Sequence, residues 1–137
     1  MGTIHKTHTE YTGKMAFDSQ INGHHILIDT VAAGGGDNTG PNPKPLMLSA
    51  LAGCTGMDVV SVLTKMRATF SDFAIDVEAD LSDEHPRVYT EIRVHYFIKI
   101  TEPEKMEKAM NLSKDTYCGV SAMLAKICPV KFEIHYL

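Results

Sequence analysis

The chain has 137 residues, of which 44% are hydrophobic and 22% charged, with a formal net charge of −4 at pH 7. This length is typical of one domain, so we expect a single domain over residues 1–137. The negative charge argues against nucleic acid as a partner, because binding to phosphates requires a basic surface. Small polar residues interrupt the apolar runs, which argues against a membrane span.

The first third of the chain is predicted to contain three strands, over residues 4–11, 14–19 and 24–30. The first two strands form a hairpin that turns near Thr12 and Gly13. Asn22 and Gly23 give the stronger turn signal before the third strand, because both residue types tolerate positive φ. Residues 32–45 are rich in Gly and Pro and predict a loop.

A long helix is predicted over about residues 45–67. Between Lys44 and Lys65 its only charged side chain is Asp58, so we expect a central helix that is covered on most sides. One small sheet cannot cover such a helix. We therefore expect a dimer that buries it between two subunits.

The second half of the chain predicts a sheet and two further helices. Alternation predicts two inward-facing rows, formed by Phe73, Ile75 and Val77 and by Ile92, Val94, Tyr96 and Ile98. Residues 101–104 have the capping-box spacing and open a helix, and a short helix to about residue 127 follows a break near Cys118. A last strand covers residues 130–136. The order β-β-β-α-β-β-α-α-β predicts an α+β fold with antiparallel sheets.

Two of the three cysteines, Cys54 and Cys118, lie in helical stretches far apart in the sequence. A thiol with a pKa of about 8.5 is only a few per cent thiolate at neutral pH, so a reactive cysteine needs a nearby cation or helix N-terminus. Cys54 lies well inside its helix, and Asp58 one turn later opposes a thiolate. From these residues alone, a small core residue is the favoured interpretation of Cys54 and of Cys118, and core filling is also the role that we expect for Cys128.

The cysteine count also bears on compartment and metals. An odd number of cysteines and a polar N-terminus without a signal-peptide apolar region predict the reducing cytoplasm. The Cys and His residues lack the close ligand pairs of structural zinc sites, so we expect no metal and no cofactor.

Two segments carry a resemblance to a known family. Residues 40–55 (Gly-Pro-Asn-Pro-Lys-Pro-Leu-Met-Leu-Ser-Ala-Leu-Ala-Gly-Cys-Thr) and 112–121 (Leu-Ser-Lys-Asp-Thr-Tyr-Cys-Gly-Val-Ser) resemble the two cysteine signatures of the OsmC/Ohr family. That family contains osmotically inducible and organic hydroperoxide resistance proteins. Residues 23–29 and 86–90 also resemble its YhfA-like branch, and the resemblance covers essentially the whole chain.

The resemblance implies an OsmC-like fold, an intertwined homodimer with the cysteine helices at its centre and a sheet on each side. It also implies a two-cysteine peroxidase. Cys54 would attack an organic hydroperoxide and become a sulfenic acid, and Cys118 would condense with it to a disulfide. A dithiol reductant, in the family a dihydrolipoyl group, would then reduce the disulfide.

The peroxidase branches of the family carry a Glu at the position of Lys44 and an Arg in the N-terminal hairpin, near Lys14 or Met15. Lys44 and Lys14 are therefore the candidate thiolate-stabilising residues, although a lysine lacks the bidentate fork of an arginine. By the same resemblance, the candidate residues for an apolar substrate pocket are Phe17, Met47, Leu51 and Met57.

Two other classes of function stay open. The missing Glu and Arg favour a non-enzymatic protein of the same fold that senses oxidation or binds an apolar small molecule. The second class is a thiol–disulfide exchanger, which the absence of a Cys-x-x-Cys motif makes less favoured.

Overall fold

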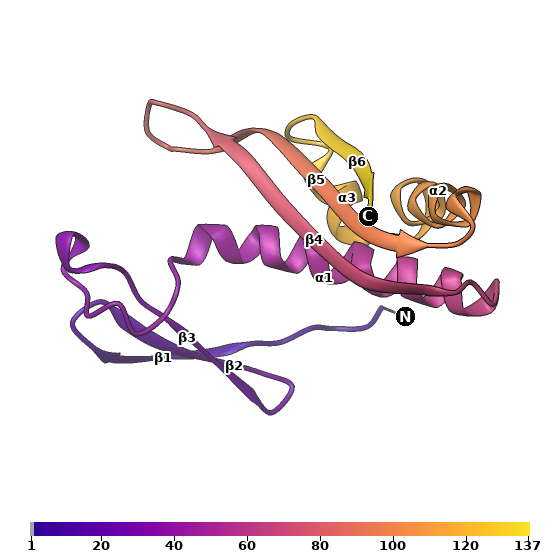
Figure 1. Cartoon of the computed structure of the whole chain (residues 1–137). Helices are drawn as coiled ribbons and strands as arrows, with labels where there is room; N and C mark the ends of the chain where they lie inside the picture. Colours follow the sequence, from indigo (N-terminus) through magenta and orange to yellow (C-terminus); the bar gives the residue numbers. More distant parts are fainter. Residues whose placement is uncertain (1) are drawn as a thin grey trace. The chain divides into compact units, whose positions relative to one another are not determined.

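A computed structural model describes residues 2–137 of the chain (Figure 1). Its internal contacts group into two compact units, one up to Met47 and the other from Leu48 to Leu137. Element order is β-β-β-α-β-β-α-α-β, as predicted, with a short 3₁₀ turn and a π-helical turn added. The mixed α+β class is confirmed.

The N-terminal unit contains a three-stranded antiparallel sheet, formed by β1 (His8–Gly13), β2 (Ala16–Ile21) and β3 (His24–Ile28). The first turn lies two residues later than predicted, at Lys14 and Met15. Lys14 itself takes the positive φ of 50°, beside Gly13 with a φ of 130°. The predicted turn at Asn22 and Gly23 is confirmed, with both residues at positive φ.

The Gly-rich loop after β3 is organised around one carboxylate. Asp29 is buried and accepts hydrogen bonds from the backbone N–H groups of Thr30, Asp37 and Thr39 and from the Thr39 hydroxyl. These donors lower the pKa of Asp29 to about 2, the two hydrogen bonds from Thr39 having the largest effect. A Cβ atom at Gly36 would lie 2.2 Å from the Thr30 carbonyl oxygen, so this position requires glycine.

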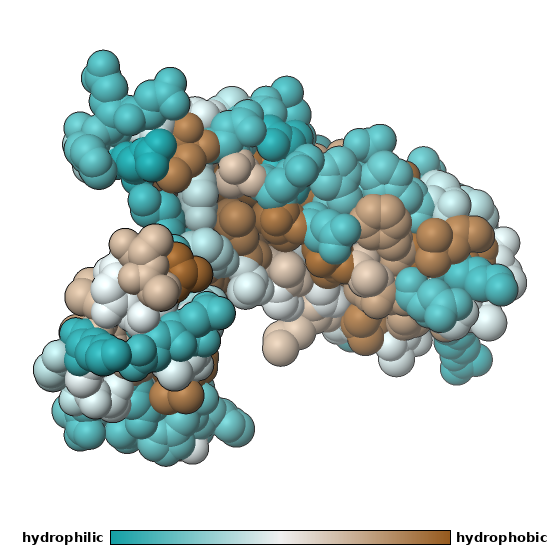
Figure 2. Space-filling view, turned by 60° about the vertical axis from the view of Figure 1, so that its left-hand side comes forward, coloured by the Kyte–Doolittle hydropathy of each residue, from teal (hydrophilic) through white to brown (hydrophobic). Residues whose placement is uncertain are grey.

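Helix α1 (Pro43–Lys65) begins and ends two residues earlier than predicted. From Leu48 onward it buries a single stripe at every fourth position, formed by Leu51, Thr55, Val59 and Leu63. A single chain therefore does not cover α1 on most sides, contrary to the prediction, because Met57 is 77% exposed and Val60 is 40% exposed. Figure 2 shows hydrophobic residues, coloured brown, at the surface of the chain between hydrophilic regions.

Helix α1 is also long and apolar enough to cross a membrane, and 22% of its most apolar window is buried in the chain. The small polar residues within it therefore do not exclude a span, contrary to the sequence argument. A core helix of a soluble protein passes the same test, so the observation is weak support for a membrane segment.

The C-terminal unit contains a second three-stranded sheet in the order β4 (Phe70–Leu81), β5 (Tyr89–Ile100) and β6 (Val130–Tyr136). β4 and β5 are antiparallel, but β5 and β6 are parallel, which corrects the prediction of wholly antiparallel sheets. The helical segment between residues 103 and 124 returns the chain to the end of the sheet where β5 begins. A crossover of this kind makes the next strand parallel.

The inner face of this sheet forms the core as predicted. Ile92, Val94, Tyr96 and Ile98 of β5 are at most 1% exposed, and the β4 row of Phe73, Ile75 and Val77 packs on them. Helix α1 packs on this face with its buried stripe, and so do α2 (Pro103–Leu112) and α3 (Gly119–Leu124), which are joined by a π-helical turn over Ser113–Tyr117.

The start of α2 differs from the predicted capping box. Glu102 is the N-cap residue, and its side chain makes no capping hydrogen bond. Pro103 follows in the first turn, where its missing N–H costs nothing. Instead, Glu102 forms an ion pair with Lys105 at 2.8 Å.

Candidate functional site

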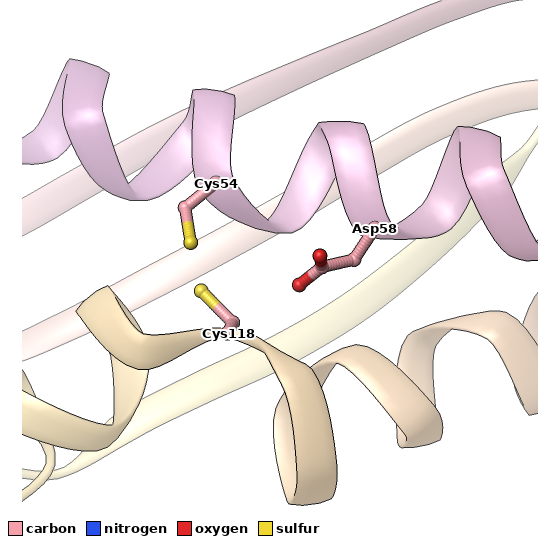
Figure 3. Close-up of side chains that lie close together, drawn as sticks. All are labelled: Cys54, Asp58 and Cys118. Atoms are coloured by element: carbon pink, nitrogen blue, oxygen red, sulfur yellow. The ribbon is translucent and has the colours of Figure 1, made fainter. Parts of the chain in front are cut away.

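Cys54 and Cys118, which the sequence places 64 positions apart (118 − 54), face each other within the C-terminal unit. Figure 3 shows the Cys54 side chain pointing from α1 toward Cys118, with the Asp58 carboxylate pointing at the same gap. The two sulfur atoms and a carboxylate oxygen of Asp58 all lie within 4.8 Å of one another. All three cysteines are free thiols.

The break in the helical segment places Cys118. After the π-helical turn, Cys118 leaves the helical conformation, with φ −78° and ψ 99°, and becomes the N-cap residue of α3. Its N–H donates to the Ser113 carbonyl at 2.8 Å, and its sulfur accepts a hydrogen bond from the Ser121 N–H at 3.4 Å. The predicted break near Cys118 is thus confirmed.

The two thiols differ in accessibility. Cys118 is buried, with 3% of its surface exposed, whereas Cys54 is only partly buried. An external reagent therefore reaches Cys54 more readily than Cys118.

The surroundings raise the pKa of the Cys54 thiol. Burial has the largest effect, followed by a hydrogen bond with the Cys118 thiol, and the Asp58 carboxylate adds a smaller effect of the same sign. A hydrogen bond from the backbone N–H of Val120 favours the thiolate and partly offsets these effects on the pKa. The sequence argument that Asp58 opposes a thiolate is confirmed.

A buried chain of hydrogen bonds ends at Asp58. The Ser113 hydroxyl donates to the Asp58 carboxylate at 3.0 Å and lies 2.8 Å from the Thr55 hydroxyl, which lies 2.6 Å from the Tyr96 hydroxyl. Because Ser113 has one proton and gives it to Asp58, Thr55 must donate to Ser113 and Tyr96 to Thr55. Every hydroxyl proton in the chain therefore points toward Asp58.

Sequence reasoning missed Thr55, Ser113 and the inward hydroxyl of Tyr96 as members of the site. Thr55 and Ser113 are fully buried, and the position of Thr55 on the buried face of the apolar helix α1 would have been the available signal for that residue. Burial, followed by the nearby Cys118 and Asp58, raises the pKa of Tyr96 to about 12 against the opposing hydrogen bond with Thr55, so this hydroxyl stays protonated.

A groove of about 350 Å³ runs beside the carboxylate and is lined by Asp58, Ser61, Val62, Lys65, Met66, Lys108, Leu112 and Tyr117. Two of these residues, Lys65 and Lys108, carry positive charge. Tyr117 directly precedes Cys118, so the groove lies next to the segment that carries the second thiol.

The candidate pocket residues have different surroundings. Leu51 is fully buried in the core cluster, which makes it a packing residue. Met57 lines an open apolar groove of about 520 Å³ together with Gly53, Gly56, Val60, Ser61 and Phe73. Met47 is 43% exposed, and the ring of Phe17 contacts that of Tyr11 in a tilted arrangement in the N-terminal sheet.

The candidate cationic residues both belong to the N-terminal unit. Lys14 lies in the first turn and pairs with Asp37 at 2.8 Å, and this contact raises its pKa. Lys44 lies in the first turn of α1. Their role toward the Cys54 thiol, and that of Phe17 and Met47 as pocket residues, stay predictions.

Two groups of side chains have the composition of metal ligands. Cys54, Asp58 and Cys118 form one, and His95, Glu133 and His135 form the other. The second group was not visible in the sequence, because pairing between strands does not appear as a spacing.

Comparison with known proteins places the chain in a family. The family model described as OsmC-like protein matches residues 35–133. The chain belongs to the OsmC-like family. The protein YhfA of Escherichia coli K12 is 33% identical over 106 residues, which cover 76% of each chain. The predicted YhfA-like resemblance is therefore confirmed.

Solved structures agree with this assignment. A hypothetical protein from Aquifex aeolicus matches with a TM-score of 0.84 and 26% identity over 99% of both chains. The organic hydroperoxide resistance protein OhrB of Bacillus subtilis matches with a TM-score of 0.67 and 19% identity, covering 97% of this chain and 98% of its own. The second likeness shows the same fold, and the OsmC-like fold predicted from the sequence is confirmed.

Proposed function

We propose that this protein is a thiol-dependent peroxidase that reduces organic hydroperoxides through a two-cysteine cycle. The observation that carries the proposal is the meeting of Cys54 and Cys118, two free thiols from distant parts of the chain. Membership of a family that includes organic hydroperoxide resistance proteins supports the choice of substrate class.

Cys54 is the attacking residue, because it is the more accessible thiol. Its sulfur attacks the terminal oxygen of the hydroperoxide ROOH, the O–O bond breaks, and the products are Cys54 sulfenic acid and the alcohol ROH. The Cys118 sulfur then attacks the sulfenic sulfur, which forms the disulfide and releases water. Rotation of the two side chains can bring their sulfur atoms from within 4.8 Å to bonding distance.

Asp58 handles the proton in this scheme. Its carboxylate lies near both sulfurs, so it can accept the thiol proton as the bond to oxygen forms and return it to the departing alkoxide. The hydrogen bond from Ser113 holds the carboxylate in place. This role compensates for the unfavourable effect of Asp58 on a resting thiolate.

A dithiol resets the enzyme. Its two thiols are oxidised to a disulfide while the Cys54–Cys118 disulfide is reduced to two thiols. By family resemblance, a dihydrolipoyl group is the proposed reductant. Free thiols at rest fit a reducing compartment such as the cytoplasm, which is the localisation that we propose.

We propose a homodimer as the functional form. Helix α1 leaves Met57 and Val60 exposed beside the apolar groove that contains Phe73. A second copy of the chain is the occupant that an intertwined OsmC-like assembly would place there, and burial of this surface would stabilise the assembly. Sedimentation of the intact chain at micromolar concentration tests this, and a monomer would contradict it.

The decisive experiment is peptide mapping of the fully reduced protein after reaction with one equivalent of cumene hydroperoxide. We expect a rapid Cys54–Cys118 disulfide, which Cys54→Ser abolishes. Cys118→Ser should instead accumulate a sulfenic acid on Cys54, because the resolving thiol is missing.

Cys128→Ser is the matched control. Cys128 is also buried, and burial also raises its pKa, but it lies outside the pair. Its replacement should leave disulfide formation unchanged. Thiols that remain unmodified after prolonged exposure to peroxide would overturn the proposed function.

A further inference from the structure

A second constellation lies on the outer face of the C-terminal sheet, away from the buried thiols. His95 of β5 stands directly opposite Glu133 of β6 in the parallel register. His135 follows Glu133 by two residues and therefore shares its face of the strand. The strand pairing thus brings together three metal-binding residue types that the sequence separates. Figure 1 shows β5 and β6 side by side.

The three side chains converge on one point. Nδ1 of His95 lies 2.9 Å from Nε2 of His135 and 3.6 Å from Oε2 of Glu133. The same Glu133 oxygen lies 3.9 Å from Nε2 of His135. Ligand atoms on a zinc ion at about 2.0–2.2 Å are separated by similar distances, so small side-chain rotations suffice to place a cation between them.

Neighbouring side chains fix the orientation of both imidazole rings. The other ring nitrogen of His95 lies 3.2 Å from a carboxylate oxygen of Glu78 on β4. A proton on that nitrogen leaves Nδ1 free to bind a cation, which is the usual arrangement of metal-binding histidines. The ring of His135 stacks on Phe97 with ring centroids 4.7 Å apart. The site is therefore oriented before any ion binds.

The charges around the cluster permit a cation. Arg93 and Lys131, which precede His95 and Glu133 by two residues on their strands, are both paired with carboxylates, Lys131 with Glu91 at 2.6 Å. Arg93 binds Glu78, Asp80 and Glu91. Glu133 is 63% exposed and makes its close polar contacts with the two histidines, so its charge is available to an ion.

We propose that His95, His135 and Glu133 form a binding site for a divalent transition-metal ion, with Zn²⁺ as the representative. Two imidazoles and a carboxylate are a known ligand set for zinc and leave a further coordination position for water. The ion would join the edge strand β6 to β5 through side chains, in addition to the backbone ladder. Its effect is on the stability of this sheet, independent of the thiol chemistry.

Equilibrium dialysis of the reduced, metal-free protein against ZnCl2 tests the site. We expect about one zinc ion per chain to be retained, with three protein ligands. His135→Gln removes a ligand and should abolish tight retention. Glu78→Gln removes only the support behind His95 and should weaken binding by roughly 10- to 100-fold. Zinc should raise the Tm of the unaltered protein and not that of His135→Gln.

Two controls separate this site from alternatives. His25→Gln alters another exposed histidine that pairs with a carboxylate, Asp18, at 2.9 Å, and should leave zinc binding unchanged. Cys54→Ser should also leave it unchanged while it abolishes the proposed peroxide chemistry. Zinc that is lost in Cys54→Ser and kept in His135→Gln would place the ion at the thiols and overturn the proposal, as would an unaltered protein that retains no zinc.

Discussion

Strand β5 places polar side chains on two faces with very different surroundings. On the inner face, Tyr96 is fully buried and its hydroxyl begins the chain through Thr55 and Ser113 to Asp58. On the outer face, Arg93 and His95 pair with carboxylates at the solvent boundary.

The difference shows that access to solvent decides how much a polar contact contributes to the stability of the fold. A buried hydroxyl that loses its partner cannot be compensated by water, so each link of the inner chain is needed. The outer ion pairs exchange freely with water and contribute little to folding, but their geometry remains available for binding an ion. The same strand thereby contributes to a fixed buried hydrogen-bond chain on one face and to an adaptable surface on the other.

The largest effect on stability is expected from Thr55→Val. Valine has nearly the same shape, but it leaves the hydroxyls of Tyr96 and Ser113 without their shared partner in a buried setting. We expect the free energy of unfolding to fall by about 1–3 kcal/mol. Urea denaturation measures this. Thr90→Val, at an exposed threonine that bonds the Asp80 carbonyl, is the control, and equal effects of the two would show that burial does not decide the cost of a lost hydroxyl.

A change in reactivity is expected from Asp58→Asn. The Asp58 charge raises the pKa of Cys54, so its removal lowers that pKa and increases the thiolate fraction at neutral pH. The rate of alkylation by iodoacetamide at pH 7 should rise, and the pH profile of alkylation should move to lower pH. The turnover of hydroperoxide should fall, because the proton acceptor is lost. A profile that does not move would show that burial and Cys118 alone control the thiol.

The smallest effect is expected from Arg93→Gln on the outer face. Despite three carboxylate partners, these pairs lie on a solvent-accessible face where water screens them, so stability at pH 7 should change less than in Thr55→Val. A loss as large as that of Thr55→Val would contradict the contrast between the two faces.

The pH dependence of the same variant sharpens this test. Hydrogen bonds from Arg93 lower the pKa of Glu78 and Asp80, and Lys131 and Arg93 lower that of Glu91. The stability from these pairs is present above the ordinary carboxyl pKa of about 4 and is lost as pH falls through the lower folded values. In Arg93→Gln, the free energy of unfolding should therefore decrease less steeply as the pH falls through this range, which acid unfolding curves measure.

Much of the fold follows from local sequence patterns. Alternation identified the buried row of β5, and the Asn22-Gly23 pair identified its turn, because side-chain period and positive φ are properties of a few adjacent residues. The parallel direction of β6 was not predictable in this way. It depends on where the crossover through α2 and α3 delivers the chain.

The candidate site divides in the same manner. Cys54 and Cys118 were found from their signatures, and Asp58 from its position one turn after Cys54. Ser113 and Thr55 were missed because their partners lie 55 and 41 positions away, so no spacing reveals them. His95 and His135, 40 positions apart, were missed for the same reason.

The sequence by itself determined the family, the order of the elements and the two thiols that can form a pair. Only the tertiary structure decided that the two thiols face each other, that burial and Cys118 raise the pKa of Cys54 more than Asp58 does, and that two histidines and a glutamate meet across β5 and β6. Secondary structure and signatures arise from neighbouring residues, whereas electrostatics and ligand geometry depend on distances between side chains that only packing sets.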